Sequence, residues 1–260
     1  MRRVFAYSFK DFIRSWWNIL YTLFFLVAAV SFLFLNHDLS KGIVSLMNLV
    51  ILLCPLIATI FGYMYFFNSQ EFTNLLLAQP LSRRSIFAGQ YLGLASSLSM
   101  SLTVGMGIPF FIYGLTVSDQ ISNFLVLIFV GIALTFIFTA MSFLIAIYSR
   151  NRLKGFGIVI LFWLFMAVIY DAMFLMLLIS FKEFPLEKMA ITMSLANPID
   201  LGRVLILLKL DISALMNYTG ALFNKFFTRD IGMLMSVSTL LFWIVWPLWA
   251  MLRKANRRDF

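Results

Sequence analysis

Few residues in this sequence have the types and the spacing that enzymatic chemistry requires. His37 is the one histidine and Cys54 the one cysteine, so neither has a partner of its own kind with which to form a metal site or a disulfide. The sequence also contains no GxxxxGKS/T, HExxH or GxSxG pattern. It therefore offers no P-loop nucleotide site and none of the usual residue sets of a zinc protease or a serine hydrolase.

Asp171 is the one charged residue inside any of the long apolar runs. A carboxylate in the hydrocarbon costs at least about 2.5–3.5 kcal/mol unless it is paired or hydrated. Asp171 is therefore either a polar or proton-linked group on a translocation path, or a hydrogen-bonded carboxyl that joins two helices. Cys54 also has two interpretations: it is either a soft ligand for copper in transit or a small apolar side chain that fills space between helices. An intramembrane enzyme that uses Asp171 is a separate hypothesis.

Membrane helices must position these residues. Hydrophobic residues make up 62% of the chain and charged residues 12%, with a mean hydropathy of +0.96, a composition that belongs in a bilayer. Runs of roughly twenty apolar residues, long enough to cross about 30 Å of hydrocarbon, recur along the sequence. Six of them are expected as transmembrane helices, at residues 17–35, 43–67, 91–115, 124–148, 156–180 and 231–252. The expected fold is an all-α polytopic membrane protein, with residues 1–260 forming a single transmembrane domain.

The distribution of basic residues predicts the orientation. With the N-terminus inside the cell, thirteen Lys and Arg residues fall on the cytoplasmic side and seven on the other side, six of these in the loop 181–230. Both termini are therefore predicted to be cytoplasmic, in a bacterial inner membrane. Juxtamembrane Lys and Arg that face anionic lipid account for most of the net charge of +9, so no nucleic-acid partner is required.

The N-terminal residues 1–16 have the pattern of an interfacial helix. Phe5, Phe9 and Phe12 recur at helical spacing, and Arg3 and Lys10 occupy the opposite side. We expect this segment to lie along the membrane surface as an elbow that leads into the first span.

A polar and basic stretch, QEFTNLLLAQPLSRRSIFAG, interrupts the apolar sequence at residues 70–89. Its leucines continue a helical pattern that must stop near Pro80, because the residue before a proline is pushed out of the α region. Ser82 can then cap a second helix, which runs into the next span. The segment 68–90 is thus predicted to be a helix, a tight corner and a second helix outside the lipid, with Glu71, Arg83 and Arg84 exposed. We interpret this corner as the docking site for a soluble partner.

The short basic loop SRNRLKG, at residues 149–155, lies on the same predicted side. Arg150 and Arg152 are either a second contact for that partner or anchors that follow the positive-inside rule.

The long outer segment 181–230 is too apolar to be disordered and has no run that could cross the bilayer. Asn197 is predicted to cap a helix that begins at Pro198 and continues for about a dozen apolar residues. This helix would lie on the outer leaflet or dip into it, followed by a second amphipathic stretch at residues 214–227.

The order of these parts resembles that of ABC type 2 transporter permeases. Within that family, the stretch NSQEFTNLLLAQPLSRRSIFAGQYLG (68–93) is most similar to the NosY-like membrane subunits that serve nitrous-oxide reductase maturation. The stretch SLANPIDLGRVLIL (194–207), which contains Asn197, Pro198 and Arg203, resembles the outer-loop motif of the same branch.

This resemblance implies a homodimer of permeases bound to two copies of a separate ATPase, which would hold ATP and Mg²⁺, whereas this chain would bind no cofactor or metal. Glu71 would enter a groove on the ATPase, flanked by Thr73, Pro80, Arg83 and Arg84. The loop 181–230 would face a periplasmic accessory subunit, and the cargo would be a copper- or sulfur-related species. An exporter of lipid, peptide or drug, and a membrane scaffold that does not transport, are the other hypotheses for the same architecture.

Overall fold

The computed structural model describes residues 1–180, 187–210 and 230–256, and all regular structure in these ranges is helical. Among the described residues, six helices are long and apolar enough to cross a membrane. They are α2 (Trp16–Asn36), α3 (Leu39–Asn68), α5 (Arg83–Ile112), α6 (Ile121–Tyr148), α7 (Arg152–Leu164) with its continuation α8 (Tyr170–Ser180), and α12 (Asp230–Ala255). The prediction of an all-α polytopic membrane protein with six such helices is confirmed.

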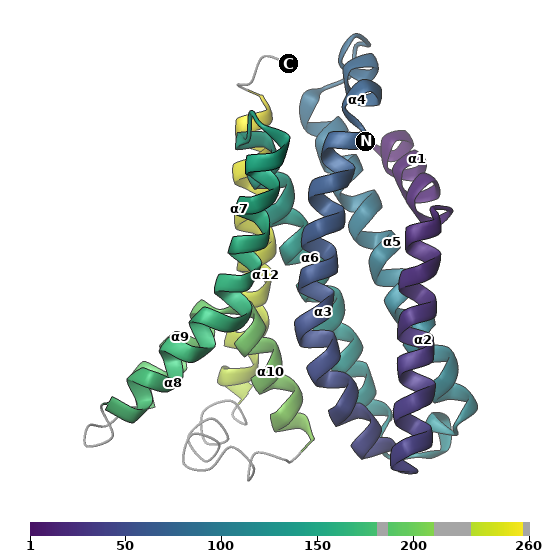
Figure 1. The fold of residues 1–260 in the computed structure, drawn as a ribbon, viewed down its shortest axis with the longest axis vertical. Coiled ribbons are helices and arrows are strands. Elements are labelled where there is room, and N and C mark those ends of the chain that lie inside the picture. Colours follow the sequence, from purple (N-terminus) through teal and green to yellow (C-terminus); the bar gives the residue numbers. More distant parts are fainter. Residues whose placement is uncertain (181–186, 211–229, 257–260) are drawn as a thin grey trace.

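The bundle has a distinct polar end. The N-terminus, the last turns of α12, the start of α7 and the short helix α4 (Gln70–Leu77) all lie at this end of the molecule (Figure 1). We refer to it as the cytoplasmic end, following the side that the basic residues predict. The connection between α2 and α3 lies at the opposite end (Figure 1).

Helices α5 and α6 form the buried centre of the bundle. Both bury most of their apolar surface, whereas α7 and α12 bury little of theirs. Helix α3 packs along α6, and α1 (Arg2–Ile13) and α2 pack along α5. The outer faces of α2, α7 and α12 therefore remain exposed as apolar surfaces suited to lipid or to another subunit.

Small residues at four-residue spacing let α5 approach α1 and α2 closely. The Oγ of Ser97 donates a hydrogen bond to the Phe9 carbonyl at 3.0 Å, and the Asn18 Nδ2 donates to the Ser101 Oγ at 2.6 Å. A Cβ added at Gly105 would lie 2.7 Å from the Thr22 carbonyl oxygen. In membranes such close backbone packing replaces the hydrophobic effect as the force that associates helices.

The observed helix ends differ from the sequence prediction where the backbone turns. The elbow α1 ends at Ile13 because Ser15 takes an extended conformation (φ −65°, ψ 138°), which starts α2 at Trp16 in a new direction. Helix α5 ends at Ile112, short of the expected residue 115, and Gly114 beyond it adopts the left-handed φ of +95°.

The fifth span is not a continuous α-helix. Residues Phe165–Ile169 form a π-helical turn between α7 and α8, and α8 leans away from the bundle (Figure 1). Beyond it, the chain bends by 113° between α9 (Glu187–Ala196) and α10 (Pro198–Lys209). Helix α10 packs back against α3, α6 and α12. The predicted stretch 214–227 lies outside the described residues.

The close approach at Gly105 should make this glycine irreplaceable. We expect Gly105→Ala to lower the stability of the detergent-purified protein by about 1–3 kcal/mol, because the new methyl group overpacks against the α2 backbone. Gly107→Ala is the matched control, since nothing lies within 4 Å of its added Cβ. Thermal unfolding followed by tryptophan fluorescence would measure both variants, and equal midpoints would contradict this packing.

Candidate functional site

The corner at residues 70–89 has the predicted helix, turn and helix. Helix α4 ends at Leu77, the chain passes through Pro80, and α5 begins at Arg83. The predicted cap is confirmed: the Ser85 amide donates to the Ser82 Oγ at 3.4 Å. The corner projects from the cytoplasmic end (Figure 1).

A buried hydrogen-bonded pair fixes the two helices of the corner. The Gln90 Nε2 of α5 donates to the Thr73 Oγ1 of α4 at 2.8 Å, and this hydroxyl donates in turn to the Ser69 carbonyl at 2.7 Å. Thr73 is 4% exposed and Gln90 1% exposed. Thr73 was expected to flank the docking residue on the strength of the family resemblance, but its side chain is turned inward and stabilises the corner. The role of Gln90 was not predicted from the sequence.

The corner is also joined to the elbow helix. The rings of Tyr7 in α1 and Phe72 in α4 stack with centroids 4.4 Å apart and planes 24° apart. Stacked aromatic pairs of this geometry add about 0.5–1.5 kcal/mol beyond the burial of their area. A displacement of α4 must therefore either move α1 or break this stack.

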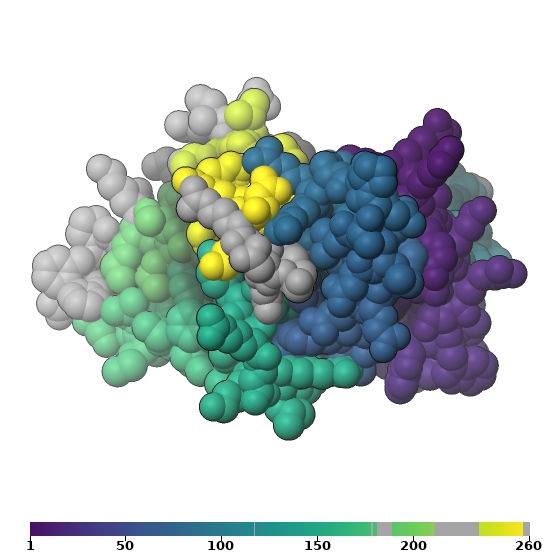
Figure 2. Space-filling view, turned by 90° about the horizontal axis from the view of Figure 1, so that it is seen from above, coloured from purple at the N-terminus to yellow at the C-terminus, as the bar shows by residue number. Residues whose placement is uncertain are grey.

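Arg84 links the corner to the last helix. When the Asn256 amide is oriented with its oxygen toward Arg84, that oxygen accepts from the Arg84 Nε at 2.6 Å and from the Nη2 at 2.9 Å. Helix α12 ends next to the corner, and Figure 2 shows the blue surface of residues near the corner between the yellow end of α12 and the purple N-terminal helices. Arg84 is thus exposed but already engaged within the chain.

The exposed face of the corner combines charge with apolar surface. Glu71 and Arg84 are exposed as expected, and Pro80 is exposed as well, but Arg83, which was also expected to be exposed, is half-buried. Leu75 is 67% exposed, which is unusual for a large apolar side chain on a polar projection. The leucine run had been interpreted only as a helical pattern, so Leu75 was missed. The sequence did contain a signal for this exposure. Leu75 follows Glu71 by four residues, so the two side chains lie on the same face of the helix, and a face that carries a glutamate is expected to be exposed.

The loop 149–155, which was predicted as a possible second contact for the soluble partner, lies against the end of α3. The Arg152 Nη2 donates to the Asn68 Oδ1 at 2.7 Å, and the Tyr63 hydroxyl donates to the Arg152 carbonyl at 2.8 Å. Arg152 therefore fastens the start of α7 to the base of the corner, and Arg150 is exposed beside it.

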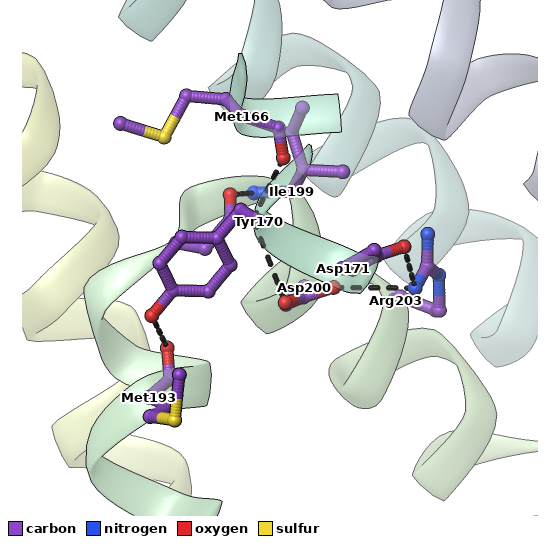
Figure 3. Close-up of polar contacts among 8 residues, drawn as sticks. Met166, Tyr170, Asp171, Met193, Ile199, Asp200 and Arg203 are labelled. Carbon is purple, nitrogen blue, oxygen red and sulfur yellow. Dashed lines mark hydrogen bonds and ion pairs between the residues drawn. The ribbon is translucent and has the colours of Figure 1, made fainter. Parts of the chain in front are cut away.

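At the other end of the bundle, Asp171 belongs to an ion-pair cluster (Figure 3). The Arg203 Nη1 lies 2.8 Å from the Asp171 Oδ2 and 3.2 Å from the Asp200 Oδ1. Two carboxylates thus share one guanidinium, and the contact joins α8 to α10. Of the two interpretations of Asp171, this geometry supports the carboxyl that joins helices. Sequence reasoning named Arg203 only as part of a motif, because 32 residues separate it from Asp171.

Asn197 holds the same region together. Its Oδ1 accepts from the Ile199 amide at 3.0 Å, which confirms the predicted cap of α10. Its Nδ2 donates to the Met166 carbonyl at 2.8 Å, inside the π-helical turn, where the α-helical hydrogen-bond register is interrupted. The Tyr170 hydroxyl donates to the Met193 carbonyl at 2.7 Å (Figure 3).

Cys54 lies in the core between α2 and α3. It is fully buried, and its sulfur lies 3.6 Å from the Tyr21 hydroxyl. This position fits the apolar filler better than a ligand on an open path. Among the residues that the structure describes, no three His, Cys, Asp or Glu side chains gather as a metal site.

The six candidate membrane helices of the described residues, with an amphipathic elbow helix and a projecting corner at one end, define a polytopic membrane protein. The chain belongs to the ABC-2 family of transporter proteins, whose family model matches residues 3–253. No match was found among curated proteins. The chain is therefore the multi-pass permease component of an ABC transporter, and an ABC transporter is driven by an ATPase.

Breaking the ion-pair cluster should destabilise the outer half of the bundle. We expect Arg203→Gln to lower the unfolding midpoint, because it leaves the carboxylates of Asp171 and Asp200 close together without a counter-ion. Combined with Asp171→Asn, a double-mutant cycle should show a coupling of about 0.5–3 kcal/mol. Lys209→Gln, an exposed change on the same helix, is the control. Additive effects of Arg203→Gln and Asp171→Asn would show that the pair contributes nothing.

Proposed function

We propose that residues 70–89 dock the separate ATPase and transmit its motion to the membrane helices. The observation that carries this proposal is the corner itself: a helical projection at the end of the bundle where the N-terminus and the last turns of α12 lie, presenting Glu71 and Leu75 to solvent. An exposed leucine beside a carboxylate offers a partner an apolar anchor and a charge that sets its register.

The contacts of the corner suggest how force would spread. Thr73 and Gln90 tie α4 to α5, Tyr7 and Phe72 tie it to α1, and Arg84 and Asn256 tie its second helix to α12. A push on the corner would therefore move three parts of the bundle together. Rigid-body motion of packed helices is a common way to convert ATPase closure into alternating access.

We propose that the functional unit is a homodimer with two ATPase subunits. Most of the surface of α7 and α12 is unburied and apolar, and a second copy together with membrane lipid would cover it. A detergent-corrected mass of one 29.9 kDa chain per particle would contradict the dimer.

The finer assignment rests on the likeness of residues 68–93 and 194–207 to NosY-like subunits. On this basis the transporter would sit in a bacterial inner membrane and deliver a copper- or sulfur-related species for nitrous-oxide reductase maturation, with α9 and α10 facing a periplasmic accessory subunit. The alternative function is export of a lipid, peptide or drug, and it would use the same corner to bind the ATPase. Uptake into inverted membrane vesicles, with the vesicle contents analysed for metals and for lipids, would distinguish these cargoes.

Substitutions of the charged and apolar residues exposed on the corner should weaken the binding of the ATPase. We expect Glu71→Lys and Leu75→Asp each to reduce the ATPase that co-purifies with the chain by at least about tenfold, because losing a central anchor costs roughly 2 kcal/mol or more. Asp119→Lys is the matched control, an exposed acid at the opposite end of the bundle. The measurement is nucleotide hydrolysis in the affinity-purified complex, with unfolding midpoints taken in parallel.

Two results would overturn the docking proposal. One is a wild-type preparation that contains no nucleotide hydrolase. The other is unchanged hydrolase recovery with both corner variants.

A further inference from the structure

A cleft of about 780 Å³ opens between the elbow helix, the end of α3 and the start of α4. Its walls are largely aromatic and include Trp17, Phe61 and Phe72. Its polar lining includes Asp11, Arg14 and further side chains from the end of α3. The volume far exceeds that of a few ordered waters, so the cleft can hold a sizeable molecule.

The elements around the cleft indicate that it lies at the depth of the lipid headgroups. The amphipathic elbow α1 forms one side, and the other sides are the points where α2 enters the membrane and α3 leaves it. Trp16 and Trp17 next to it are 69% and 60% exposed, and exposed tryptophans are typical of the membrane interface. A lipid of the adjacent leaflet can therefore enter the cleft sideways.

The charges that line the cleft favour one kind of headgroup. Asp11 and Arg14 are three residues apart in the sequence, around the end of α1, and both are exposed. Neither forms an ion pair with another residue in the part of the chain that the structure describes. The basic residues Arg2, Arg3 and Lys10 of the same helix do not line the cleft. A single acid beside a single base complements a zwitterion better than it complements an anion.

We propose that this cleft binds one phospholipid of the cytoplasmic leaflet with a primary-ammonium zwitterionic headgroup, of the phosphoethanolamine type. Arg14 contacts the phosphate, and Asp11 accepts hydrogen bonds from the ammonium group. The aromatic wall and Ile60 cover the upper part of an acyl chain. The assignment depends on the cytoplasmic placement of this end and not on the docking of an ATPase.

The bound lipid would also contact the corner. Phe72 lines the cleft and stacks on Tyr7, which lines it as well. An occupant of the cleft therefore supports the stack that joins α4 to α1, so the lipid composition of the leaflet would influence how firmly the corner is held.

The test is native mass spectrometry of the full-length chain in mild detergent, exchanged against equal amounts of dioleoyl phosphatidylethanolamine, phosphatidylglycerol and phosphatidylcholine. We expect one phosphatidylethanolamine to be retained at least about fivefold over either competitor, the discrimination that one or two charge-assisted hydrogen bonds can provide. Arg14→Gln should remove the retained lipid, and Asp11→Asn should remove the preference for ethanolamine over glycerol. Lys10→Gln, on the same helix but outside the cleft, should behave as wild type.

A second variant tests the cleft itself. Ile60→Trp should obstruct the apolar part of the cleft and reduce retention without changing a charge, and the unfolding midpoint of each variant shows that it is folded. Equal retention of all three lipids, or lipid binding that survives both Arg14→Gln and Ile60→Trp, would overturn the proposal. So would a crosslink from a cysteine at position 11, in a Cys54→Ala background, to a second protein chain in place of lipid. No ATPase is present in the lipid measurements, so their failure would leave the docking proposal untouched.

Discussion

The architecture depends on a buried hydrogen bond between two polar side chains, the Gln90 amide of α5 and the Thr73 hydroxyl of α4, 2.8 Å apart. Both groups are almost completely buried, so separating them would leave a donor and an acceptor without water, a cost of about 1–3 kcal/mol for each group. Because this bond is expensive to break, α4 keeps a fixed orientation on the most heavily packed part of the bundle. A corner held in this way can carry force, whereas a flexible loop of the same length would absorb it.

The two ends of the bundle are organised differently around the buried helices α5 and α6. At the cytoplasmic end, hydrogen bonds and ring contacts connect the corner to α1, α5 and α12. At the opposite end, Arg203, Asp171 and Asn197 connect the broken fifth span to α10, and the π-helical turn supplies the Met166 carbonyl that Asn197 binds. Ion pairs and hydrogen bonds of this kind can exchange partners without unfolding a helix. The fold thus combines one end at which the corner is held to three helices with an opposite end that is fastened by a few polar contacts.

Much of the fold was readable from the sequence because the membrane imposes strong rules. Helix length, apolar composition and the caps at Ser82 and Asn197 are local properties, and the structure confirms them. What could not be predicted depends on residues distant in sequence. The pairing of Asp171 with Arg203, the inward turn of Thr73 toward Gln90 and the link from Arg84 to Asn256 arise only when separate helices are packed together. The π-helical turn leaves no mark in an apolar run of ordinary length. Leu75, by contrast, could have been singled out from its position four residues after Glu71, on the same helix face.

The central claim is that the tip of the corner touches a nucleotide-hydrolysing subunit in the cytosol. Gln79, exposed at this tip, is the position at which to place a photo-crosslinking amino acid such as benzoylphenylalanine. Irradiation of native membranes should join the chain to a subunit that binds ATP, and the same residue at position 119, at the other end of the bundle, should give no such product. A chain that remains uncrosslinked at position 79, or that yields the ATP-binding product only from position 119, would contradict the account.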